Sequence, residues 1–130
     1  MFTANLSGAE EVPAADTLAR GQAIFQPSAD GTELKYRLIV ANIENVLQAH
    51  IHLGPAGVNG PVVAFLYGPA PIPGRFSGVL AQGTITAGDL VGPLAGQPLS
   101  ELLDAMAAGN TYANVHTTQF PGGEVRGQIR

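Results

Sequence analysis

The sequence predicts an all-β domain, a Greek-key β-sandwich with one short helix near residues 98–108. Short stretches of strand-forming residues recur about every 10 residues along the chain. The 130 residues include 17 glycines and 10 prolines, which provide many turns for a single domain spanning residues 1–130. Only one segment has the 3.6-residue period of a helix. A β-trefoil or another small barrel is the alternative architecture.

The expected strands end at turn residues. The clearest hairpin joins residues 18–26 to residues 33–41, because Asp30 and Gly31 lie between them and supply the positive φ that hairpin turns favour. Residues 68–78 contain three prolines and are expected to form a loop. The other expected strands are a start at Phe2-Thr3-Ala4 and residues 47–53, 62–67, 78–86, 111–117 and 123–129.

The expected helix has an apolar stripe formed by Leu99, Leu102, Leu103 and Met106, which occupy positions i, i+3, i+4 and i+7. Pro98 suits the first helical position, and we expect Met106 to pack in the core rather than to bind a metal. The expected core comprises Phe25, Leu34 or its strand partners, Leu38, Val40, Ile51, Val63, Leu102, Leu103 and Val115.

Composition excludes several classes of protein. Charged residues make up 12% of the chain and hydrophobic residues 45%, which is not the composition of a disordered segment. The net charge is −4 and the six basic residues are scattered, so no nucleic-acid-binding patch is expected. The sequence has no membrane span, since no run of about 18 apolar residues occurs. Cysteine is absent, which excludes disulfides, thiolate metal sites and cysteine nucleophiles.

The three histidines are the most informative residues. His50 and His52 flank Ile51 in an apolar strand, so both imidazoles should face one side of the sheet while Ile51 faces the other. His116 lies in another expected strand, where Val115 can point into the core and His116 away from it. If the two strands are neighbours, three imidazoles converge.

Convergent imidazoles would form a metal site with few or no carboxylates. Such a donor set suits copper best, then zinc or nickel. A closed structural zinc site would need four protein ligands, so a fourth position would belong to water, substrate or a backbone group. The competing interpretation is that the paired histidines have no ligand, which is common for exposed pairs of histidines.

Other candidate chemistry is sparse. Glu10 and Glu11 are adjacent, so on a strand they would face opposite ways, and we expect them to be loop or edge residues. Arg126 can face the same side as Glu124, giving a surface ion pair, or it can approach the histidines. No catalytic residues are assigned.

Three blocks of the sequence resemble the signature of the CHRD domain, which is named after chordin and is widespread in exported bacterial proteins. The blocks are FTANLSGAEEVP at residues 2–13, AHIHLGPAGVNGPVV at 49–63 and YANVHTTQFPGGEVRGQI at 112–129. The first block departs slightly, because Glu10-Glu11-Val12-Pro13-Ala14 stands where family members commonly have Asn-Glu-Val-Pro-Pro. The resemblance implies a secreted, periplasmic or cell-surface location, and we expect that a signal peptide is removed from the natural chain.

The CHRD domain is in turn similar to the copper-zinc superoxide dismutase sandwich, so the resemblance implies a superoxide-dismutase-like fold. His50, His52 and His116 match the copper-binding histidines of those enzymes, and Arg126 is a candidate match to their arginine. The bridging and zinc-site histidines have no counterpart here, nor has the disulfide, so the resemblance implies at most a copper-only site.

These observations predict copper binding through His50, His52 and His116, for buffering, uptake or delivery. One alternative is a copper-only, superoxide-dismutase-like enzyme; a domain with this charge and without the bridging histidine is expected to show little or no such activity. Another alternative is a non-enzymatic secreted interaction module with a protein partner, as the chordin resemblance implies.

Overall fold

The computed structural model describes residues 1–130 as seven strands, one α-helix and three short 3₁₀ turns. The strands are β1 (Phe2–Ser7), β2 (Arg20–Pro27), β3 (Leu34–Leu53), β4 (Val62–Tyr67), β5 (Ile72–Ile85), β6 (Thr111–Thr117) and β7 (Val125–Gln128). The helix is α1 (Leu99–Ala107), and the 3₁₀ turns are η1 (Gly8–Glu10), η2 (Ala87–Asp89) and η3 (Gly92–Leu94).

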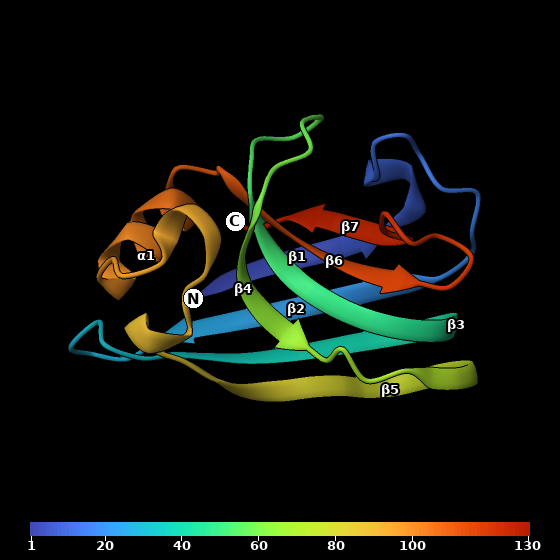
Figure 1. Ribbon diagram of the computed structural model, residues 1–130, viewed down its shortest axis with the longest axis horizontal. Coiled ribbons are helices and arrows are strands. Elements are labelled where there is room, and N and C mark those ends of the chain that lie inside the picture. The colour runs from blue at the N-terminus through green and yellow to red at the C-terminus, as the bar shows by residue number, and fades with distance from the viewer.

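The strands form two layers that share β3 (Figure 1). The first half of β3 pairs with β2 and β5, whereas its second half pairs with β6 and β4. The pairs β1–β2, β1–β7 and β6–β7 join the two layers on the other side. The predicted all-β, sandwich-like domain is therefore confirmed, and its layers close into a flattened barrel.

The long strand β3 changes layer at a bend. Asn42 and Asn45 have φ values of 57° and 54°, in the left-handed region that asparagine tolerates better than most residues. The pairing of β3 with β5 shifts register on both sides of this bend. The sequence predicted two strands at residues 33–41 and 47–53, but the two stretches are one continuous strand.

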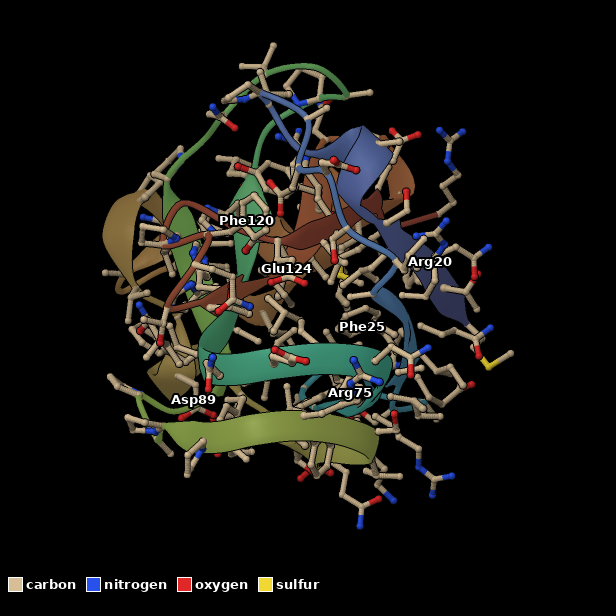
Figure 2. All side chains as sticks on the ribbon, turned by 90° about the vertical axis from the view of Figure 1, so that its right-hand side faces the viewer. Arg20, Phe25, Arg75, Asp89, Phe120 and Glu124 are labelled. Atoms are coloured by element: carbon tan, nitrogen blue, oxygen red, sulfur yellow. The ribbon has the colours of Figure 1, made fainter.

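A single hydrophobic core lies between the layers. Phe25 and Leu38 from one layer pack in the same cluster as Ile51 and Val115 from the other. Figure 2 shows Phe25 in the interior. All the expected core residues are buried except Leu103, which is partly buried and packs against the same cluster.

Helix α1 confirms the helix predicted near residues 98–108. Its apolar stripe buries Leu99, Leu102 and Met106 at one end of the sandwich (Figure 1). Met106 is a core residue, as expected. Neither α1 nor the 3₁₀ turns have the length and hydrophobicity that a membrane-spanning helix requires.

The expected loop at residues 68–78 is only partly right. Strand β5 begins at Ile72, within the proline-containing stretch. It pairs only with β3, so it is an edge strand. An edge strand tolerates proline when the missing N–H would face away from its partner.

Candidate metal centre

The histidines lie on two adjacent strands. In the β3–β6 pairing, His50 is opposite Asn114 and His116 is opposite Gln48. Ile51 and Val115 are fully buried in the core on the opposite face of this layer. The predicted facing of the histidines is therefore confirmed, and loops cover them on the side away from the core.

The three imidazoles form a compact buried cluster. One nitrogen from each of His50, His52 and His116 lies within 4.8 Å of the other two. The residues are only 4%, 8% and 8% exposed. His50 Nδ1 lies 3.1 Å from His116 Nε2.

Backbone carbonyls fix which nitrogens carry protons. His52 Nδ1 donates to the Gly60 carbonyl at 2.9 Å, and His116 Nδ1 donates to the Pro121 carbonyl at the same distance. The Nε2 atom of each neutral ring is therefore left with a lone pair. His116 Nε2 accepts from His50 Nδ1 in this state, whereas His52 Nε2 is buried and has no hydrogen-bond partner.

Burial keeps these rings neutral. It lowers the pKa of His50 to about 4, with further lowering from the charges of His116 and His52. Burial also lowers the pKa of His52 and of His116, although their hydrogen bonds to backbone carbonyls act in the opposite direction. Neutral imidazole is the form that binds a metal ion.

Aromatic rings form the walls of the cluster. Phe65 on β4 meets the His50 ring edge-on, with centroids 4.6 Å apart, and is 45% exposed. Tyr112 stacks on His52 with centroids 4.8 Å apart and ring planes 5° from parallel. Tyr112 thus covers the ring of His52, and the partly exposed ring of Phe65 covers that of His50.

Arg126 does not form the surface ion pair that was one of its two predicted roles. It is 1% exposed and donates to the side chain of Asn59 and to backbone carbonyls of the 54–60 loop. Its predicted partner, Glu124, is also buried and instead accepts hydrogen bonds from Thr17 and Thr117. Arg126 takes the other predicted role and approaches the histidine cluster through Tyr112.

Glu11 was expected in a loop or at an edge, and its burial was missed. The side chain follows η1, is only 6% exposed, and has one carboxylate oxygen without a partner. Burial raises the pKa of this carboxyl to about 7, although Arg126 and the Asn114 side chain act to lower it. Sequence spacing gave no signal for this, because the loop that carries Glu11 is folded against residues more than 100 positions away.

The remaining polar groups on this face support the cluster rather than extend it. Asn114 lies between His50 and Arg126 in the sheet register, and its Oδ1 atom is also buried without a partner. Gly123 lets the chain pass close to Glu11 and Asn114, since a Cβ atom there would collide with both. Its φ of 125° likewise favours glycine.

Comparison with known families agrees with this fold and with the sequence blocks. A model of the CHRD domain matches residues 2–129. The chain belongs to the CHRD domain family. No curated protein and no solved structure gives a match, so the relation of this CHRD domain to superoxide dismutases stays a prediction from its histidine pattern.

The histidine cluster of the CHRD domain has the donor set of a metal site. The lone pair on His52 Nε2 is a buried acceptor without a donor, which normally requires an explanation. A metal ion would satisfy it, and the carbonyl partners of His52 and His116 are the outer-shell contacts that metal-binding histidines usually have. His50 would take part through a nitrogen freed from its hydrogen bond to His116.

Proposed function

We propose that this CHRD domain binds copper through His50, His52 and His116 and serves in copper binding, buffering or delivery outside the cytoplasm. The observation that carries the proposal is the buried group of three neutral imidazoles, with nitrogens within 4.8 Å of one another. The unpartnered Nε2 of His52 supports it independently.

Copper is the metal that best suits these donors. The cluster offers imidazole nitrogens, and the chain has no thiolate to favour a structural zinc site. Divalent copper also binds nitrogen ligands more tightly than zinc does. With three protein ligands, one coordination position is left for water, an anion or a donor from a partner protein.

Binding is favoured over superoxide dismutation by the placement of Arg126. A cation that attracts a superoxide anion must be accessible, but Arg126 is 1% exposed and its guanidinium donates to groups within the chain. The net charge of −4 opposes anion capture as well. We therefore expect little or no dismutase activity in a stopped-flow assay of the copper-loaded protein; a rate constant near about 10⁹ M⁻¹s⁻¹ that is lost in His116→Ala would contradict this.

The direct test is a copper titration of single His→Ala variants, using protein purified without an affinity tag. Each of His50→Ala, His52→Ala and His116→Ala should lose tight binding of one Cu(II) ion. Gln48→Ala is the matched control, because Gln48 lies opposite His116 on β3 but supplies no imidazole. Unchanged stoichiometry and affinity in all three histidine variants would eliminate the site.

Failure of that titration would favour the interaction module. A scaffold that only binds a protein partner would not depend on the three imidazoles. In that case the histidine variants would bind the partner as well as the natural sequence does.

A further inference from the structure

Arg126, Tyr112 and His52 form a continuous stack behind the histidine cluster. The guanidinium carbon of Arg126 lies 3.4 Å from the centre of the Tyr112 ring. The Tyr112 ring is in turn nearly parallel to His52, with centroids 4.8 Å apart. The stack places a permanent positive charge one ring away from a proposed ligand.

The same arginine holds the loop of residues 54–60, which connects β3 to β4. One guanidinium nitrogen donates to the side chain of Asn59, and another donates to the carbonyls of Pro55 and Val58. Figure 1 shows this loop rising from the end of β3 at the top of the view. Without these bonds, the Asn59 side-chain oxygen and the Val58 carbonyl would lose their donor, whereas the Pro55 carbonyl would keep the Val58 N–H.

The end of this loop controls the proton on His52. The Gly60 N–H donates to the Tyr112 hydroxyl at 2.9 Å, and the Gly60 carbonyl accepts from His52 Nδ1. Gly60 is also pressed against the Leu53 carbonyl, where a Cβ atom would collide. The position of the Gly60 carbonyl therefore depends on Tyr112 and on the loop that Arg126 holds.

No carboxylate forms an ion pair with Arg126, although its charge acts on the nearby buried carboxyl of Glu11 and lowers the pKa of that group. The only salt bridge in the chain joins Arg75 to Glu44 at the surface. Arg126 is instead bonded to neutral carbonyl and amide oxygens. A buried charge acts over several ångströms because surrounding protein screens it less than water does.

We propose that Arg126 is a positioning residue of the histidine cluster. It acts through Tyr112 and the 54–60 loop to hold His52 in the form whose Nε2 carries no proton. Its charge also makes the site favour Cu(I) over Cu(II). A nearby cation repels a doubly charged ion more than a singly charged one. The second half of the inference rests on the proposed copper binding, whereas the first half concerns the metal-free protein.

Nuclear magnetic resonance of the metal-free protein tests the positioning role. Long-range proton–nitrogen correlations at neutral pH report which nitrogen of His52 carries the proton. We expect the Nδ1–H form in the natural sequence and a mixture of both forms in Arg126→Gln and in Tyr112→Phe, which keeps the ring but removes the hydroxyl. Arg75→Gln is the control, since Arg75 is exposed and its only ion-pair partner is Glu44 at the surface. An unchanged His52 tautomer in folded Arg126→Gln and Tyr112→Phe would overturn this role.

Competition with a Cu(I) chelator under ascorbate, and separately with a Cu(II) chelator, tests the effect of charge. Arg126→Gln should lower the ratio of Cu(I) to Cu(II) affinity by about tenfold. Tyr112→Phe and Arg126→Lys keep the charge, so each should keep this ratio even if both affinities fall. An unchanged ratio in Arg126→Gln would overturn the charge effect, and Arg126→Lys matching Arg126→Gln in the ratio would do so as well.

The two experiments separate failure of this inference from failure of the proposed function. If the natural sequence binds neither copper ion, the proposed function fails and the charge effect fails with it. The His52 tautomer still tests the positioning role in that case. If Arg126→Gln does not fold, Tyr112→Phe carries the tautomer test. The charge test then uses Arg126→Met, in which the apolar side chain replaces the stem of the arginine and an unchanged ratio would again contradict the effect.

Discussion

The buried carboxyl of Glu11 should make the domain less stable as the pH rises, and Glu11→Gln should remove this dependence. The pKa of Glu11 is raised from 4.5 to about 7 by burial. A carboxyl whose pKa is higher in the folded state contributes stability that is fully present below pH 4.5 and is lost as the pH rises through 7. Each unit of pKa difference corresponds to about 1.4 kcal/mol, so the loss amounts to about 3 kcal/mol.

Urea unfolding of the metal-free protein at about pH 5 and about pH 8.5 measures this effect. The free energy of unfolding of Glu11→Gln minus that of the natural sequence should be about 2 to 3 kcal/mol more positive at the higher pH than at the lower, because only the natural sequence loses stability as the pH rises. The histidines change stability over part of the same pH interval, but they are present in both proteins and cancel in the comparison. Glu10→Gln is the matched control, because Glu10 is the exposed neighbour of Glu11.

The reasoning fails if Glu11→Gln and the natural sequence differ by the same free energy at both pH values. That result would mean that the carboxyl is solvated as an ion in the folded protein. If the stability difference between Glu10→Gln and the natural sequence changed by as much between the two pH values, the effect would be one of net charge and would not come from burial.

Three further predictions concern packing, backbone and acid stability. Leu102→Ala should lower the free energy of unfolding by about 2–5 kcal/mol and Leu103→Ala by clearly less, since Leu102 is fully buried and Leu103 only partly. Equal losses in urea unfolding would contradict the assigned helix face. Gly123→Ala should lower the free energy of unfolding by at least about 2 kcal/mol, because Gly123 has a positive φ and a Cβ atom there would collide with its neighbours. Gly31 has a positive φ but open space around it, so Gly31→Ala should lower the free energy of unfolding by only about 1 kcal/mol; the reverse order would refute the crowding at Gly123. The pKa of His50 is lowered from 6.5 to about 4, so its contribution to stability is present above pH 6.5 and is lost as the pH falls through 4. In the metal-free protein, His50→Gln should remove about 3 kcal/mol of this loss, and an unchanged dependence of the free energy of unfolding on pH would contradict it.

Local patterns were enough to predict the facing of the histidines. In a strand, side chains two positions apart share a face, so His50 and His52 had to lie together once Ile51 was assigned to the core. The same argument placed His116 opposite Val115. Helix α1 was predictable for a similar reason, because its apolar stripe repeats within nine residues.

Features that depend on distant partners were not predictable. Strand β3 continues through Asn42 and Asn45 because each half finds strand partners from separate parts of the chain, and no local signal specifies this. The buried side chain of Glu11 lies beside Asn114 and Gly123, which are more than 100 residues away in the sequence. Arg126 was read as either a surface residue or a neighbour of the histidines, since the strand pattern assigned its face but not the loop that covers that face.

Electron paramagnetic resonance of the protein loaded with one Cu(II) ion tests the central claim most directly. The protein must carry no affinity tag, so that the three native histidines are its only imidazoles. We predict a single copper species with hyperfine splitting from three imidazole nitrogens, which changes in each of His50→Ala, His52→Ala and His116→Ala. A spectrum without coupling to imidazole nitrogens would contradict the assignment of this cluster as a copper site. Spectra of the three variants that match that of the natural sequence would contradict it as well.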